Sequence, residues 1–169
     1  GRHALSTSLH LREDQHERLE AAPGGESEPT ERYTVRTGSV SAADRVALGA
    51  RTALTLVAAL DDFAVTSAWR ADGLAGEEGS STLLSPQAEL DVALGRSVAG
   101  SIALYRRTRF PTLRQLYGGD YPNPTLEPQI ATGASAGIIW RPDERAQVAA
   151  TLYADRVDDL ITRRGRDYD

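Results

Sequence analysis

The segment RTRFPTLRQLYGGDYPNPTLEP, which begins at Arg107, contains three arginines and two tyrosines. Guanidinium groups bind carboxylates and phosphates through a planar fork of donors, and aromatic faces attract cations. Exposed together, such groups suit a bulky anionic ligand. An alternative interpretation is that the two tyrosines pack the segment on itself or anchor it at an interface. The candidate ligand-contact residues are Arg107, Arg109, Tyr117 and Tyr121.

Other side chains that could bind a metal or act as acids and bases are weaker candidates. The histidines His3, His10 and His16 cluster near the start of the chain, where solvated strand ends are a simpler prediction than a metal site. The doublets Asp61-Asp62 and Asp158-Asp159 could serve acid–base chemistry or hold calcium. Each doublet is predicted where a strand meets water, so a charged rim is the simpler interpretation. We therefore expect no metal site.

The sequence lacks the usual signatures of an enzyme or a nucleic-acid partner. It has no cysteine, and Gly118-Gly119 is not followed by the Lys-Ser/Thr of a phosphate loop. The net charge is −5 with a sequence pI of about 5.2, which argues against a phosphate backbone as the main partner. All 19 basic residues are arginine. We expect neither catalysis, nor a cofactor, nor nucleic-acid binding.

Alternation of apolar and polar residues is the main structural signal. It is clear over Leu5–Leu11, Leu84–Leu94 and Val148–Ala154, where every second residue is apolar or small and most of the others are polar. A period of two is typical of strands, and a helix would place Asp91 on the apolar stripe of its segment. These segments predict an antiparallel sheet with one apolar and one polar face.

The connections between the predicted strands alternate between long and short. Long polar stretches occur at 13–31, 63–82 and 108–128, whereas the other connections are tight turns such as "ALGAR", "GRS" and "PDER". This rhythm is typical of outer-membrane barrels, which have short periplasmic turns and long extracellular loops, and Trp140 beside a short turn fits a periplasmic interface anchor. The predicted strands are 3–12, 32–46, 52–62, 83–94, 98–107, 129–141 and 146–157.

The fold class predicted from these patterns is all-β: an antiparallel up-and-down meander of about seven strands that forms part of a transmembrane β-barrel. An eleven-residue strand tilted by about 45° covers roughly 25 Å, the height of the apolar band. One segment leaves an alternative open. Residues 42–62 can also be drawn as an amphipathic helix, with Ser41 and Asp44 as its capping pair, in a soluble α+β binding module. Gly49 and the β-branched Thr52, Thr55 and Val57 oppose that helix.

The segment "RTRFPTLRQLYG" followed by "NPTLEPQ" and "SAGIIWRPDERAQVAATLYADRVDDLI" resembles the C-terminal barrel region of TonB-dependent outer-membrane receptors. The resemblance is good over about 83–162 and looser before it. Two departures from the family pattern are Gln129 in place of glutamate and Arg109-Phe110 before Pro111.

The resemblance implies that residues 1–169 are an internal fragment of a receptor barrel of probably 22 strands, without its plug domain. It also implies a protein of the outer membrane, in contact with its lipid, that imports a scarce, bulky nutrient such as a siderophore or cobalamin. The ligand would be a small molecule or metal chelate. The energy-transducing TonB complex would act through an N-terminal part outside this chain.

The aromatic segment itself is predicted to be a stiff loop. Thr112 and Gln115 have the spacing of a capping box for one helical turn that carries Leu113, Leu116 and Tyr117. Prolines restrict the chain on both sides of that turn. We expect this loop to fold over a barrel mouth and to present aromatic and arginine side chains to a ligand.

Overall fold

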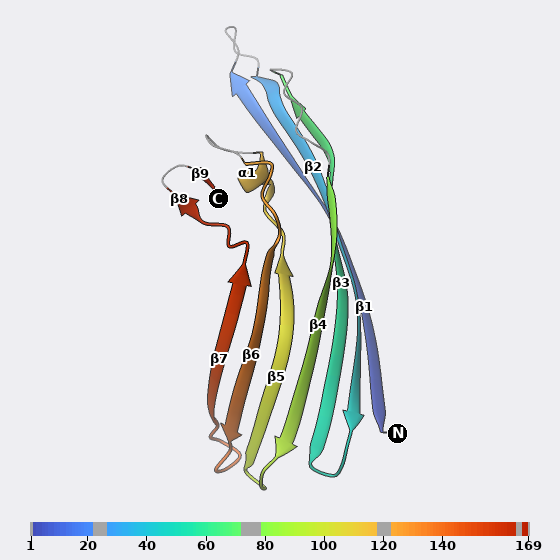
Figure 1. The fold of residues 1–169 in the computed structure, drawn as a ribbon, viewed down its shortest axis with the longest axis vertical. Helices are drawn as coiled ribbons and strands as arrows, with labels where there is room; N and C mark the ends of the chain where they lie inside the picture. Colours follow the sequence, from blue (N-terminus) through green and yellow to red (C-terminus); the bar gives the residue numbers. More distant parts are fainter. Residues whose placement is uncertain (1, 22–26, 72–78, 118–122, 165–166, 169) are drawn as a thin grey trace.

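A single antiparallel sheet of seven strands dominates the structure, a computed structural model that describes residues 2–21, 27–71, 79–117, 123–164 and 167–168 (Figure 1). The strands lie in sequence order, and every neighbouring pair is antiparallel. Within the described residues, no helix is long and apolar enough to cross a membrane. The elements are β1 (His3–Ala21), β2 (Ser27–Ala47), β3 (Thr52–Arg70), β4 (Ser80–Ala93), β5 (Val98–Arg109), α1 (Leu113–Leu116), β6 (Gln129–Trp140), β7 (Val148–Asp158), β8 (Arg163–Arg164) and β9 (Asp167–Tyr168).

The register of the sheet separates the side chains into two faces. Leu90 pairs with Leu54 and Ile102, and the same row continues through Ala136 to Leu152. Because directly paired residues of an antiparallel sheet point to one side, this row forms an apolar face. Leu84, Val92 and Val148 share its parity along their strands, so the prediction that these residues lie on one side is confirmed.

The opposite face is polar. One of its rows pairs Thr55 with Glu89 and continues through Ala103 to Ser135, and the next brings Asp91 opposite Ser101. The large side chains that remain exposed lie mainly on the apolar face, including Leu152 at 80% and Ile102 at 59%. An apolar face without a packed layer on it differs from the solvated faces of soluble proteins.

The two ends of the sheet differ. At one end lie the tight turns around 48–51, 94–97 and 141–147, shown at the bottom of Figure 1. In the first of them, the backbone N–H groups of Leu48 and Gly49 both donate to the carbonyl of Thr52. At the other end lie α1 and the extended ends of β1, β2 and β3. We call these the short-turn end and the long-loop end.

Three strands extend further toward the long-loop end than predicted. Residues 13–21 and 27–31 belong to β1 and β2, and 63–70 belong to β3, although the sequence predicted loops there. Polar residues dominate both faces of the β1 and β2 extensions, and in the β3 extension Phe63 and Val65 alternate with small residues rather than charged ones, so no clear apolar–polar alternation marks these segments. Cross-strand ion pairs join β1 to β2 instead, at Glu13–Arg36 and Glu17–Arg32, both at 2.7 Å.

Two smaller predictions about position are also wrong. His16 lies within β1 rather than in a loop, and Asp61-Asp62 lie inside β3 rather than at its rim. The hydroxyls of Ser85 and Thr82 donate to Asp61 and Asp62 respectively, which satisfies both carboxylates within the sheet. The helical alternative for 42–62 is wrong as well, because this range is the β2–β3 hairpin. Its tight turn contains Gly49, one of the residues that opposed the helix.

The sheet parts between β4 and β5. Their pairing covers only Gln87–Ala93 against Ala99–Tyr105, although both strands continue toward the long-loop end. Pro86 stands where the pairing ends, and a proline has no N–H to contribute to a ladder. Figure 1 shows β4 leaning away from β5 beyond this point.

Candidate functional site

The predicted stiff loop is present at the long-loop end of the sheet. Thr112 caps α1, its hydroxyl accepts from the backbone N–H of Gln115 at 3.4 Å, and the Gln115 side chain accepts from the Thr112 N–H at 2.9 Å. The predicted capping box is therefore confirmed. The carbonyls of Thr112 and Leu113 accept from the N–H groups of Leu116 and Tyr117, which closes the single turn.

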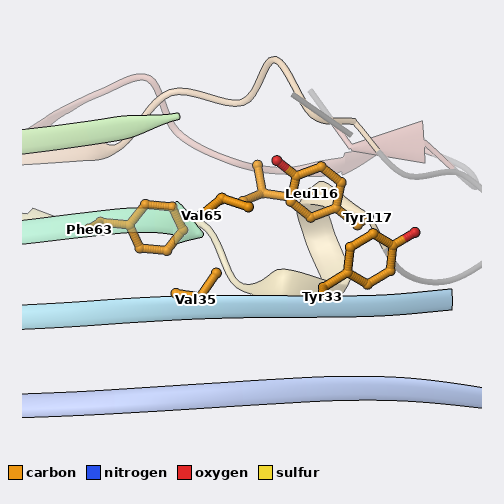
Figure 2. Close-up of a cluster of buried hydrophobic side chains, with 6 residues drawn as sticks. All are labelled: Tyr33, Val35, Phe63, Val65, Leu116 and Tyr117. Carbon is orange, nitrogen blue, oxygen red and sulfur yellow. The ribbon is translucent and has the colours of Figure 1, made fainter. Parts of the chain in front are cut away.

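This loop packs on the polar face of the extended strands rather than standing free in solvent. Tyr33 is completely buried, and its ring stacks on that of Tyr117 with centroids 4.8 Å apart. Phe63 stacks on Phe110 at 5.2 Å. Figure 2 shows the residues of β2, β3 and the loop converging. We call this group the mouth cluster; it consists of Tyr33, Val35, Phe63, Val65, Leu116 and Tyr117.

A small cavity lies beside the mouth cluster. Its volume is about 180 Å³, and its lining includes Phe63, Pro111, Leu126 and Pro128. Pockets for small-molecule ligands usually have volumes of about 300–1,000 Å³. The packed side of the loop is therefore suited to stiffening the loop and not to enclosing a bulky ligand.

The predicted contact residues fall into three environments. Arg107 and Arg109 lie at the end of β5 and are exposed, and their parity places them on the polar face. Tyr117 is 7% exposed and belongs to the mouth cluster, so it packs the loop. Tyr121 lies outside the described residues. The structure thus brings the two arginines together on one rim and separates them from Tyr117.

Neither Arg107 nor Arg109 forms an ion pair with an acidic residue in the part of the chain that the structure describes. The Arg107 guanidinium instead lies 4.1 Å from the centroid of the Tyr105 ring, a cation–π contact that leaves its N–H donors available. The Tyr105 hydroxyl in turn donates to Asp155 at 2.6 Å. Tyr105 and Asp155 therefore hold one wall of the rim in a fixed position.

Gly133 makes this arrangement possible. A Cβ at Gly133 would lie 1.9 Å from the Asp155 Oδ1 atom and 2.9 Å from the Tyr105 ring, so the Asp155 carboxylate lies where a side chain would otherwise be, with the ring beside it. Gly133→Ala is expected to break the Tyr105–Asp155 hydrogen bond and to lower the free energy of unfolding by about 1–3 kcal/mol. Equilibrium unfolding of the full-length protein measures this.

Gly100→Ala is the matched control on the neighbouring strand. Its added methyl group would come no closer than 3.4 Å to the flexible Leu94 side chain. An equal loss of stability in both variants would contradict the role assigned to Gly133.

The remaining candidates do not assemble into a site. His3 pairs with Asp44 at 2.9 Å on the apolar face near the short-turn end, and His16 stacks loosely on Tyr33. His10 lies on the polar face. No group of three or more metal-ligating side chains occurs among the described residues.

Two features of the polar face were missed by the sequence analysis. Arg45 of β2 reaches Asp91 of β4 at 2.5 Å and Thr55 at 3.1 Å, which links three strands. The second is the mouth cluster, which includes Val35 of β2 and Val65 of β3, two strands that extend beyond their predicted ends. A faint signal existed, because Tyr33 and Val35 alternate with polar residues, as do Phe63 and Val65 with small ones.

Comparisons with known proteins agree with this architecture. Residues 3–169 match the family described as "TonB dependent receptor-like, beta-barrel". Among solved structures, a copper transporter, OprC, is similar with a TM-score of 0.80 and 17% identity, over 99% of this chain and 29% of that protein. The ferric-catecholate import receptor Fiu from E. coli K12 is similar with a TM-score of 0.69 and 14% identity, over 98% of this chain and 30% of that protein. No curated protein sequence matches.

The two structural matches show the fold and the extent of the chain. Its 169 residues span about three-tenths of the length of either solved protein. The open sheet is therefore a part of a larger barrel wall, with its apolar face toward lipid and its polar face toward the lumen. Since the family match covers nearly all of the chain, the chain belongs to the TonB-dependent receptor-like β-barrel family, whose barrels lie in the outer membrane.

Proposed function

We propose that this chain is a wall segment of a receptor that imports a scarce, bulky, anionic metal chelate, such as a siderophore complex, through a plugged barrel. In this proposal the plug and the segment that engages the TonB complex belong to the rest of the full-length receptor. Arg107 and Arg109 are the contact residues for the ligand on this part of the rim, and Tyr121 lies close to them in sequence. Tyr117 supports them by stiffening the loop.

The observation that carries this proposal is the pair of uncompensated arginines on the luminal rim. Both are exposed, neither has an acidic partner in the described ranges, and Arg107 is oriented by the Tyr105 ring. A planar guanidinium fork matches carboxylate, catecholate or phosphate oxygens. The two similar solved proteins are named for copper and for a ferric catecholate, which supports a metal-containing ligand.

A binding experiment on the full-length receptor tests the proposal. The probes are an iron(III) tris-catecholate complex, which is anionic, and the free copper(II) ion, which is cationic. In the double variant Arg107→Gln/Arg109→Gln, the Kd for the anionic chelate is expected to rise by roughly ten-fold or more, because two charge-assisted contacts are lost. Binding of copper(II) is expected not to weaken.

Arg106→Gln is the matched control, since Arg106 neighbours both residues but faces lipid. It is expected to leave the Kd for the chelate unchanged. Equal chelate binding by the double variant and the wild type would overturn the proposal, as would binding of copper(II) alone.

A further inference from the structure

A groove opens on the lipid-facing side of the wall where β4 and β5 part. Its volume is about 550 Å³, within the range of small-ligand sites. Pro86 lies on one side of it and Leu104 on the other, and pairing between the two strands ends at Gln87 and Tyr105. The lipid-facing side chains that line the groove are Leu56, Pro86, Ala88, Leu104, Arg106 and Thr132.

The lower part of this groove suits a hydrocarbon chain. Leu104 is 62% exposed and Leu56 48% exposed, and both face the membrane. A flat apolar wall gives a lipid chain contact on one side only, whereas a groove surrounds it and increases the dispersion contacts. The parting at Pro86 therefore creates a concave apolar surface at a defined height in the bilayer.

One arginine, Arg106, lines the upper end of the groove, and a second, Arg156, lies in the same row two strands away. Arg106 pairs with Thr132, and Thr132 pairs with Arg156, so the three form one row on the lipid-facing side. Along β6, Thr132 lies eight residues from Trp140 in the direction of the long-loop end, which is about 26 Å along the strand. Because the strands of such barrels are tilted, this distance corresponds to roughly 19–22 Å along the membrane normal. The apolar band is about 25 Å tall. The guanidinium groups therefore reach the level at which lipid headgroups begin.

The charge of this row is positive. Arg106 has no ion pair among the described residues, and the Arg156 Nε atom donates to Asp158 at 3.0 Å. One such bond leaves most of the donors of Arg156 available, since a guanidinium has five. Arg106, Arg156 and Asp158 together carry a net charge of +1, and the Thr132 hydroxyl between the arginines adds a donor.

We propose that the groove and the Arg106–Thr132–Arg156 row form a binding site for a phosphate-bearing lipid of the outer leaflet. One acyl chain lies between Pro86 and Leu104, and the phosphate accepts hydrogen bonds from the row. Basic pockets at the edge of the hydrocarbon region bind lipid headgroups by the same physics. Arginine suits this role because its fork matches phosphate oxygens.

Native mass spectrometry of the full-length receptor in nonionic detergent tests the proposal. The probe is lipid A carrying two phosphates, and the comparison is the same lipid after enzymatic removal of both phosphates. The wild type is expected to bind the phosphorylated form at least ten-fold more tightly. The double variant Arg106→Gln/Arg156→Gln is expected to lose that difference.

The matched control changes two arginines at the short-turn end, Arg96→Gln/Arg141→Gln, and is expected to bind as the wild type does. A second variant, Ala88→Phe, fills the groove without altering charge and is expected to weaken binding of both lipid forms. Equal binding of phosphorylated lipid by the wild type and the double arginine variant overturns the proposal. Equal binding of the two lipid forms by the wild type does the same.

Discussion

Leu152→Arg is expected to lower the free energy of unfolding of the full-length receptor by about 2–4 kcal/mol, the cost of arginine at the bilayer midplane on the lipid face of a barrel. Leu152 is 80% exposed, and its row includes Ala136 and Ile102. That row stands about 13 Å along the strand above Val148 at the short-turn end, close to the centre of the apolar band. Equilibrium unfolding from lipid vesicles in guanidinium chloride measures the loss.

The neighbouring substitution Thr151→Arg provides the control. Thr151 is also exposed but faces the lumen, where a charge stays in water. Its expected effect is less than about 1 kcal/mol, in the range of ordinary surface changes. A larger loss for Thr151→Arg than for Leu152→Arg would mean that the two faces have been assigned the wrong way round.

Tyr33→Ala is expected to release the loop of 110–128 from the wall while the barrel stays folded. Tyr33 is fully buried and stacks on Tyr117, and truncating a buried aromatic residue costs about 3–5 kcal/mol. The described part of the loop contains a single helical turn, which is too short to be stable without packing, so we expect it to lose its order when this contact is removed. Hydrogen exchange at 113–117 is expected to rise to the rate of an unprotected segment.

Tyr153→Ala serves as the control for a tyrosine on the same face. Tyr153 is 75% exposed on β7 and lies outside the mouth cluster. Exchange at 113–117 is expected to stay slow in this variant. If exchange also stays slow in Tyr33→Ala, the mouth cluster does not hold the loop.

Much of the wall could be predicted because its environment imposes a simple pattern. In β4 the strict alternation from Leu84 to Val92 follows from lipid on one side and water on the other, and the register confirms both faces. The capping box at Thr112 was predictable for a similar reason, because a cap involves residues only three positions apart.

The extensions of β1, β2 and β3 could not be predicted in this way. The extensions of β1 and β2 carry polar residues on both faces, and in β3 the apolar Phe63 and Val65 alternate only with small residues, so the pattern that marks the rest of each strand is lost. Their stability comes from partners distant in sequence, such as Arg36 for Glu13 and Tyr117 for Tyr33. The same is true of the Arg45–Asp91 pair, whose members lie on strands two apart in the sheet.

The seven-stranded meander and the side of the wall that faces lipid were predictable from the sequence, because both follow from the local alternation of apolar and polar residues and from the tight turns. The burial of Tyr117, the exposure of Arg107 and Arg109 and the parting of the sheet at Pro86 became apparent in the three-dimensional fold. Those outcomes depend on which distant side chains meet across the strands, and that information is absent from any single segment of the chain.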